Sequence, residues 1–389
     1  MPTPLDASSD RRGMDRPVAV AEEMQEAVLA WYAAHGRALP FRATHDPYAI
    51  LVSEAMSQQT QVSRVSEAWS GFIARFPTVA VLAASTPADV LRQWRGLGYN
   101  RRALALRRAA IEIRDRHGAV VPASIVDLEA LAGVGPYTAR AVAAIGFGAP
   151  VAAVDTNVRR VLRRVVFGGD EPSGPELQAV ADAAVPADRA GEWTHALMDV
   201  GAMLCRPRDP GCETCPARPW CRFAALDHGS AKGSSPARRR QARRRRSTSG
   251  RPASSHRVGE APIPFEATSR WLRGKILDRL RDAADGEWLG LDAPIGRHPQ
   301  PAVAAALIAL AREGLAELNP LDPLQARLPL GCVPNQEDSE VSASEWPPAT
   351  IDLCLSGDRA GSKSRGPESQ GHSPGRLDAR WGSTGDVKG

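Results

Sequence analysis

Four cysteines within seventeen residues constrain this chain more strongly than any other feature of its sequence. They are Cys205, Cys212, Cys215 and Cys221, with the spacing C-x6-C-x2-C-x5-C. Thiolates this close together can converge on one metal centre without ligands from distant segments. Structural zinc sites usually combine two C-x2-C pairs, and this loop contains only one. Four-cysteine iron–sulfur sites often have uneven arms, so the spacing favours a cluster over zinc, with unpaired reduced thiols as the third alternative.

Length and composition describe a chain that can form two domains with their own cores. Of its 389 residues, 43% are hydrophobic and 24% are charged, and the formal net charge of +5 suits a polyanionic partner. The clustered cysteines do not form the pattern of a secreted disulfide framework. The N-terminal stretch lacks the apolar core of a signal peptide, and no run of about twenty apolar residues is present. We therefore expect no membrane span and a reducing, cytoplasmic setting.

Periodicity divides the chain into parts expected to be ordered or disordered. Residues 20–225 show helical periodicity with short breaks at Gly and Pro and few alternating β-type runs. Residues 1–19 and 331–389 are polar and are expected to be disordered. Residues 226–264 are rich in Ser, Pro and Arg, with seven arginines between positions 238 and 246. We expect a linker here, which is either a solvated tether or a basic arm that contacts phosphates.

Residues 265–330 are expected to form a second, small module. The strings SRWLRGKILDRLRDA and HPQPAVAAALIALAREG each predict a helix. LAELNP followed by QARLPLG predicts a short β-hairpin. Two helices and a hairpin are typical of a winged-helix module; many such modules bind DNA, and many others only pack against neighbouring domains.

The string LAGVGPYTARAVAAIGFG, residues 131–148, predicts a tight turn between two helices. Gly133 and Gly135 flank the turn, and Pro136 can occupy the first position of the second helix. Glycines permit positive φ and a close approach of the backbone, and the exposed N–H groups at a helix start can bind a phosphate. We interpret the string as a helix–hairpin–helix anchor for the DNA backbone; an ordinary helix turn is the alternative.

Asp155 immediately precedes a helical run in VDTNVRRV and can cap that helix. The helix dipole would favour the ionised carboxylate. Capping alone is one interpretation of this residue. The other is that a carboxylate fixed near a phosphate anchor stabilises a positively charged sugar while a glycosidic bond breaks.

Glu54 is the complementary candidate, because it lies in ILVSEAMSQQT among apolar neighbours. Most helical glutamates face solvent. A carboxyl group in a partly dry apolar pocket, however, has a raised pKa and can serve as a general acid near neutral pH. Two carboxylates with opposed roles are the general basis of glycoside cleavage.

Six strings, in order and at suitable intervals, resemble the MutY-type adenine DNA glycosylases of the helix–hairpin–helix, endonuclease III-like superfamily. They are SEAMSQQTQV, WRGLGY, LAGVGPYTARAVAA, VDTNVRRV, MDVGAMLC and the cysteine loop CRPRDPGCETCPARPWC. The resemblance covers residues 20–225 and implies an all-α fold with two lobes and a cleft between them. One lobe is a six-helix barrel over roughly 42–148. The other combines residues 20–41 and 149–225 and holds a structural [4Fe–4S] cluster on the four cysteines.

The resemblance also implies catalytic roles. Glu54 would protonate N7 of adenine and later help to activate water. Asp155 would stabilise the oxocarbenium ion, and Asn157 would hold this carboxylate or the substrate in place. Tyr137 stands where endonuclease III-like enzymes carry a lysine that forms a Schiff base with the sugar. Since tyrosine has no amine, we expect a monofunctional glycosylase.

Further residues are expected to contact DNA. Tyr99 would wedge beside the lesion base on the opposite strand, and Gln58 and Gln59 would fill or probe the opened stack, which offsets the cost of base flipping. The remaining predicted DNA contacts are Gly133, Gly135 and Tyr137 in the hairpin, and Arg206 and Arg208 in the cysteine loop.

The C-terminal part departs from the family. Many MutY-type enzymes end in a Nudix-like domain with a Phe-Ser-His stretch that recognises 8-oxoguanine, and this chain has no such stretch. We predict a base excision repair enzyme that removes adenine mispaired with 8-oxoguanine or guanine. The alternatives are a mismatch thymine or uracil DNA glycosylase, a non-catalytic DNA-binding relative, and a zinc-stapled structural protein. The expected partner is double-stranded DNA with a mispaired or damaged base, bound by a monomer at the bacterial nucleoid.

Overall fold

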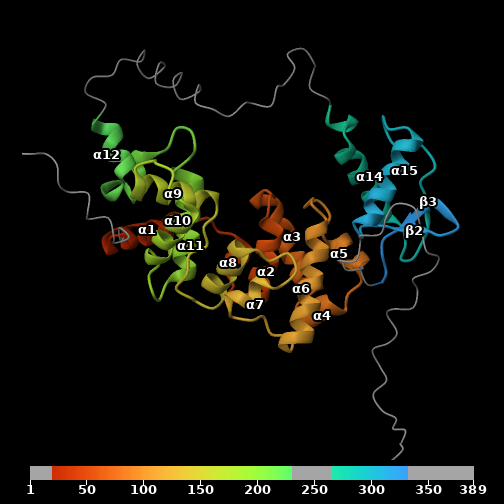
Figure 1. Cartoon of the computed structure of the whole chain (residues 1–389), viewed down its shortest axis with the longest axis horizontal. Coiled ribbons are helices and arrows are strands. Elements are labelled where there is room, and N and C mark those ends of the chain that lie inside the picture. Colours follow the sequence, from red (N-terminus) through yellow and green to blue (C-terminus); the bar gives the residue numbers. More distant parts are fainter. Residues whose placement is uncertain (1–19, 230–263, 332–389) are drawn as a thin grey trace, which may run out of the picture. The chain divides into compact units, whose positions relative to one another are not determined.

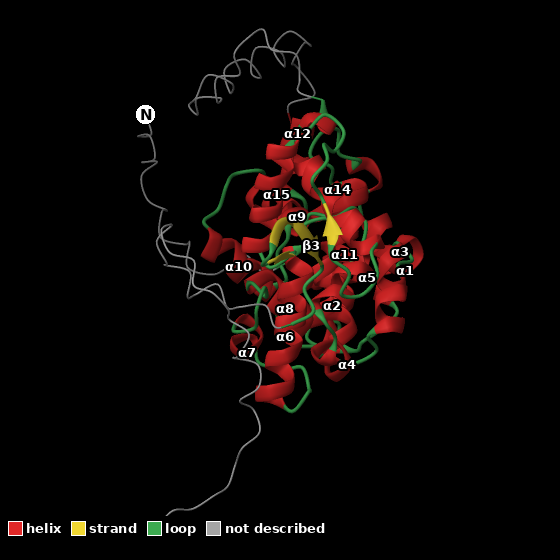
Figure 2. Ribbon diagram, turned by 90° about the vertical axis from the view of Figure 1, so that its right-hand side faces the viewer, coloured by secondary structure: helices red, strands yellow, loops and turns green. Residues whose placement is uncertain are grey.

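The computed structural model describes residues 20–229 and 264–331 (Figure 1). Almost all of the residues that were expected to be disordered, 1–19 and 331–389, lie outside these ranges. The same is true of the expected linker, residues 226–264. Helices dominate the described residues, and the strands lie in the C-terminal segment (Figure 2). None of the helices in these ranges is long and apolar enough to cross a lipid bilayer.

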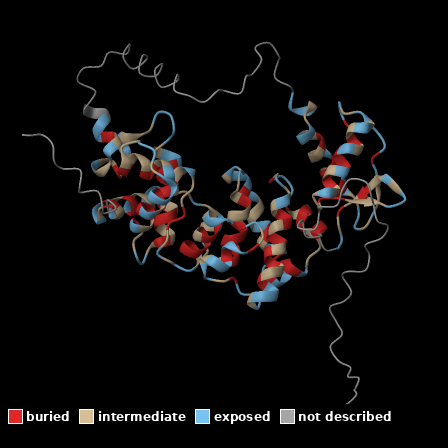
Figure 3. Ribbon diagram, in the orientation of Figure 1, coloured by how far each residue is buried: buried red, intermediate tan, exposed pale blue. Residues whose placement is uncertain are grey.

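Helices α2–α8 pack around a first hydrophobic core, and buried positions occur along these helices (Figure 3). Their bounds are α2 Pro47–Ser57, α3 Val62–Arg75, α4 Val79–Ala84, α5 Pro87–Gln93, α6 Arg101–His117, α7 Ile125–Glu129 and α8 Pro136–Gly146. Side chains cap several of these helices, as when Thr86 and Asp89 form a reciprocal capping box at the start of α5. The centre is aromatic, since the fully buried Trp94 packs edge-on against Phe72 with ring centroids 5.9 Å apart.

A second core joins the N-terminal helix to much later segments. Figure 1 shows α1 (red) among α9–α11 (green), and the residues buried there come from both parts of the chain. The elements are α1 Glu22–His35, α9 Thr156–Phe167, α10 Gly174–Ala183, α11 Ala190–Asp199, a π-helical turn Val200–Leu204, 3-10 turns Cys212–Thr214 and Arg218–Trp220, and α12 Arg222–Gly229. Gly36 is the C-cap of α1.

The C-terminal segment contains two helices and a small sheet. Its elements are a 3-10 turn Phe265–Ala267, α14 Ser269–Asp282, β1 Leu289–Gly290, α15 Gln300–Arg312, β2 Glu317–Asn319 and β3 Asp322–Arg327. The three strands are antiparallel in the order β1-β3-β2, and Ala326 of β3 faces both Leu289 and Leu318. The helices and hairpin expected from the sequence are confirmed. β1 was not expected, because two residues are too few to give a periodic signal.

The core of this segment is continuous with the core formed by α2–α8. Arg281 on α14 is only 7% exposed; its Nε donates to the carbonyl of Leu91 (2.8 Å) and its Nη2 to Oδ1 of Asn100 (2.7 Å). Arg92 on α5 donates in return to the carbonyls of Arg281 (3.2 Å) and Ala283 (3.1 Å). Buried, reciprocal hydrogen bonds of this kind hold α14 in a defined position against α5 and the loop before α6.

Candidate active site and cysteine loop

Glu54 lies on α2 between turns that are fully packed into the barrel core, while its own side chain keeps part of its surface exposed. Burial raises the pKa of Glu54 to about 7. A hydrogen bond from the Tyr137 hydroxyl lowers this pKa, the nearby Asp155 raises it, and Arg42 lowers it. The raised pKa expected from the apolar neighbours is thus confirmed, and the group is partly protonated at neutral pH.

Asp155 is the N-cap of α9, as the sequence predicts. Its Oδ1 accepts hydrogen bonds from the backbone N–H groups of Asn157 (2.8 Å) and Val158 (2.7 Å). Its Oδ2 accepts a third from the side-chain amide of Asn157 (2.9 Å). Three donors hold the carboxylate in one orientation.

Asn157 is held in place by Arg160, which also contacts the backbone at the start of the cysteine loop. Arg160 Nη2 donates to Asn157 Oδ1 (2.7 Å) and to the carbonyl of Gly201 (2.7 Å), and Arg160 Nε donates to the carbonyl of Cys205 (2.6 Å). Gly201 packs against Asn157 so closely that an added Cβ would lie 2.6 Å from the Asn157 Cβ. A chain of hydrogen bonds therefore runs from the backbone of a cysteine, through Arg160 and Asn157, to Asp155.

Tyr137 brings the two carboxyl groups into one site. It is the second residue of α8, and its ring packs against the barrel core. Burial raises its pKa well above the usual value, and both Glu54 and Asp155 raise it further. Side chains from α2, α8 and the turn before α9 thus converge. The structure places Tyr137 against the predicted acid, and its expected DNA contact stays a prediction.

A buried ion pair beside this site was missed by sequence reasoning. Asp199 is 0% exposed and accepts hydrogen bonds from Arg37 Nε (2.7 Å) and from Arg42 Nη1 and Nη2 (2.8 and 2.9 Å). Burial alone would raise the pKa of Asp199, but the bonds from Arg42 and Arg37 hold it below the usual value. Arg42 also acts on the pKa values of Glu54 and Tyr137, so it belongs to the same site.

The hairpin has the geometry expected of a backbone anchor. Gly133 has φ +77°, and an added Cβ would lie 2.7 Å from the Cβ of Ala105 on α6. Gly135 is the N-cap of α8, and Pro136 occupies its first turn. No side chain caps this helix start, so its N–H groups remain available for a phosphate oxygen.

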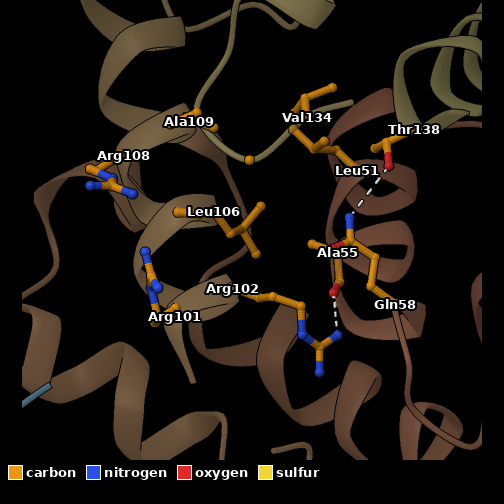
Figure 4. A pocket seen from close by; sticks show the side chains of 13 residues that line it. Leu51, Ala55, Gln58, Arg101, Arg102, Leu106, Arg108, Ala109, Val134 and Thr138 are labelled. Carbon is orange, nitrogen blue, oxygen red and sulfur yellow. Dashed lines mark hydrogen bonds between the residues drawn. The ribbon is translucent and has the colours of Figure 1, made fainter. Parts of the chain in front are cut away.

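A cavity of about 220 Å³ lies between α2, α6 and the hairpin (Figure 4). Gln58 Nε2 reaches Thr138 Oγ1 across it at 3.5 Å, and Arg101 and Arg108 lie at its edge. No carboxylate lines this cavity. Its chemistry suits contact with DNA rather than proton transfer.

The two loops expected to probe the DNA stack are held together by Arg102. Gln59 (φ 54°) and Tyr99 (φ 45°) both have left-handed backbone conformations, which are uncommon for residues other than glycine. Arg102 Nη1 donates to two carbonyls near the end of α2 (2.6 and 2.9 Å), and Nη2 donates to the carbonyls of Leu97 and Gly98 (both 3.2 Å). Tyr99 is 48% exposed, so its ring is free to contact a ligand.

The two arginines predicted in the cysteine loop lie on its surface. Arg206 donates to the carbonyl of Asp209 through Nε (3.1 Å) and Nη2 (2.8 Å), and Arg208 is exposed. Among the described residues, no hydrogen bond or ion pair joins either arginine to the Glu54 site. Their expected phosphate contacts stay predictions.

The four cysteines line one cavity, together with apolar residues, Arg164 and Arg218. Arg164 Nη1 lies 3.3 Å from Cys205 Sγ. Burial raises the pKa of Cys215 to about 11 and also raises that of Cys221. A single zinc ion needs four ligand atoms about 2.3 Å from one point. Within the described ranges, no three such side chains are grouped closely enough for one ion.

Comparison with known proteins agrees with this geometry. The family profile of the HhH-GPD superfamily base excision DNA repair proteins matches residues 52–186. The adenine DNA glycosylase of Mycolicibacterium smegmatis is 41% identical over 259 residues, which cover 66% of this chain and 80% of that protein. The adenine DNA glycosylase of Mycobacterium tuberculosis is 38% identical over 300 residues, covering 74% of this chain and 90% of that protein.

Among solved structures, a thermostable thymine-DNA glycosylase aligns with a TM-score of 0.50 and 28% identity over 52% of this chain and 95% of the other. The two mycobacterial relatives, which this chain matches over most of their length, and the family profile show that it belongs to the MutY-type adenine DNA glycosylase family, within the HhH-GPD superfamily of base excision DNA repair proteins.

Proposed function

We propose that this protein removes adenine mispaired with 8-oxoguanine or guanine, by hydrolysis of the N-glycosidic bond. One observation carries the proposal: Glu54, whose pKa is about 7, and Asp155, held by three hydrogen bonds, converge with Tyr137 in one site. A proton donor and a fixed anion are the two groups that departure of a purine from its sugar requires.

Each carboxyl group has its own step. Glu54 is about half protonated near pH 7, so it can donate a proton to N7 of an extruded adenine. The protonated base leaves with the electron pair of the C1′–N9 bond, and positive charge develops on the sugar. The Asp155 carboxylate stabilises that charge. Because three hydrogen bonds already hold the carboxylate in one orientation, it does not need to reorient during the reaction. Glu54, now deprotonated, accepts a proton from the attacking water.

The same site accounts for a monofunctional enzyme. Strand cleavage through a Schiff base needs an amine on the hairpin. Tyr137 occupies that position, and its hydroxyl is hydrogen-bonded to Glu54. We therefore expect base release without strand incision.

The cysteine loop is proposed to hold a [4Fe–4S] cluster on Cys205, Cys212, Cys215 and Cys221. When bound, the cluster would serve as a structural cross-link of the loop. The loop's own backbone then fixes Arg160, which donates to the carbonyl of Cys205, and through it Asn157.

The C-terminal segment is proposed to be a winged-helix-like module that acts with the core on double-stranded DNA, in a monomer. Its two helices and three-stranded antiparallel sheet support this assignment.

A panel of duplexes tests the proposed function. Single-turnover release of the base is measured on A·8-oxoguanine, A·guanine, T·guanine and U·guanine pairs. We expect release of adenine from the first two. Release of thymine without adenine would establish the second candidate, a mismatch thymine glycosylase, which the similarity to a thymine-DNA glycosylase favours.

A further inference from the structure

We infer that the groove between α14 and the loops at Gln59 and Tyr99 is a second DNA-binding subsite. It takes the backbone of the strand opposite the excised base, and Arg270 and Lys275 of α14 contact its phosphates. The inference rests on the proposed function in two respects: the substrate is duplex DNA, and Tyr99 lies beside the strand opposite the excised base.

The groove has a volume of about 820 Å³, within the range of roughly 300–1,000 Å³ that ligand sites occupy. One wall comes from the barrel lobe and includes Gln58, Gln59 and Tyr99. The other comes from α14 and includes Arg270 and Lys275. The residues expected to enter the DNA stack therefore share one groove with the C-terminal segment.

The charge of the groove is complementary to a phosphate backbone. Its two carboxylates are already paired, Glu313 with Arg273 (2.6 Å) and Asp278 with Arg281 (3.1 Å). The exposed Arg270 and Lys275 have no carboxylate partner among the described residues; their recorded contacts are with the aromatic rings of Tyr99 and Trp271. Two cations in one groove, uncompensated by carboxylates, suit a polyanion.

Arg270 also links the groove to Tyr99, the residue that is expected to contact the opposite strand. Its guanidinium lies 5.2 Å from the centroid of the Tyr99 ring, and that of Arg102 lies 5.6 Å from the same centroid. Arg281 fixes α14 at the neighbouring residue, through its hydrogen bond to Asn100. Any strand that Tyr99 touches therefore passes within reach of α14.

The second helix of the module is less suited to this task. Winged-helix proteins usually place the later helix in the major groove of DNA. The exposed face of α15 includes Pro301, Ala305 and Ile308, and its exposed cation, Arg312, lies at the last position of the helix. Most of this face is therefore apolar and offers nothing to phosphates, whereas α14 presents cations to the groove.

The test measures the affinity of the full chain for a duplex in which a tetrahydrofuran abasic analogue faces guanine. This duplex has no base to release, so the result is independent of catalysis. Each lost phosphate contact lowers the slope of log affinity against log salt by about 0.9. For the Arg270→Ala/Lys275→Ala variant, the magnitude of this slope should therefore be smaller by about 1.8 than for the wild type. Its affinity for the duplex at 0.1 M salt should be lower than that of the wild type by roughly tenfold or more. The matched control is Arg279→Ala, because Arg279 is exposed on the same helix but does not line the groove.

Gly274 provides a second, fold-neutral test. It lines the groove, and an added Cβ would meet no atom within 4 Å. Gly274→Glu should weaken binding because it places a negative charge in the groove, and Gly274→Ala should bind like the wild type. If the double variant keeps the slope of Arg279→Ala, and Gly274→Glu binds like Gly274→Ala, the subsite does not exist.

Uncharged methylphosphonates identify the strand. Placed beside the guanine, they should weaken binding by the wild type and have little further effect on Arg270→Ala/Lys275→Ala. If that coupling appears only with methylphosphonates beside the abasic analogue, the assignment to the opposite strand is wrong. Failure of the wild type to release adenine in the duplex panel would overturn the proposed function alone, since binding to the abasic duplex is measured separately.

Discussion

The side-chain amide of Asn157 donates a 2.9 Å hydrogen bond to Asp155 Oδ2, while the backbone N–H of the same residue donates a 2.8 Å bond to Oδ1. Asn157 thus donates a hydrogen bond to each oxygen of the Asp155 carboxylate. Arg160 holds the amide of Asn157 in the required orientation from the other side. The position of the anion is therefore set by neighbours on α9 and not by the substrate.

Asp155→Asn should abolish base release and leave duplex binding largely intact. Asparagine is an equally good N-cap, so α9 should still form, but the negative charge that stabilises the sugar cation is lost. We expect a fall of roughly 100- to 1,000-fold in the single-turnover rate constant for adenine. Glu171→Gln, a change to an exposed carboxylate on the surface, is the control. Normal cleavage by the asparagine variant would exclude the assigned role.

Tyr137→Phe should move the alkaline limb of the pH–rate profile to higher pH. Burial raises the pKa of Glu54, and the hydrogen bond from Tyr137 opposes that rise. Removal of the hydroxyl removes the opposing effect, so Glu54 should stay protonated to a higher pH. The apparent pKa is measured from single-turnover rates, and a shift to lower pH would contradict this arrangement.

Gly201→Ala should reduce activity by disturbing Asn157. The new Cβ would lie 2.6 Å from the Asn157 Cβ, so the side chain that grips Asp155 must shift. A displacement of about 1 Å in an active site can cost roughly a hundredfold in rate. Gly211→Ala, in the nearby cysteine loop, is the control, since no atom beyond the two adjacent residues lies closer than 3.8 Å to its added Cβ. Equal activity of the two variants would show that Asn157 tolerates displacement.

The purified protein should be brown, absorb visible light and contain about four iron atoms per chain. Cys215→Ser should lower the iron content and the thermal midpoint of unfolding, because the loop loses its cross-link. The comparison is Arg208→Ala, a change to an exposed residue of the same loop. A colourless protein that contains stoichiometric zinc would overturn the cluster assignment.

Local features were predicted well from the sequence. Asp155 could be recognised as an N-cap because the helix it caps follows directly, and the raised pKa of Glu54 follows from apolar residues on its own helix. The ion pairs of Asp199 were missed, because Arg37 and Arg42 precede it by 162 and 157 residues. No local pattern connects residues so distant; only the packing of α1 and the following turn against α11 does.

The contact between Arg270 and Tyr99 escaped prediction for the same reason. Residue patterns predicted the helix α14 and a DNA contact at Tyr99 in GLGY, but they carry no signal that the two would meet. Their approach depends on the buried Arg281, which looks like an ordinary surface arginine in the sequence. Tertiary packing, not local propensity, decides which charged residues become buried.

The pH dependence of adenine release by the wild type and by Glu54→Gln tests the acid–anion pair most directly. On an A·8-oxoguanine duplex under single-turnover conditions, the wild-type rate constant should be steady below pH 7. Above about pH 7, where Glu54 loses its proton, it should fall about tenfold per pH unit. Glu54→Gln should be slower by roughly 100- to 10,000-fold and lack this limb. A glutamine variant that keeps the wild-type rate and the same alkaline limb would show that another group delivers the proton.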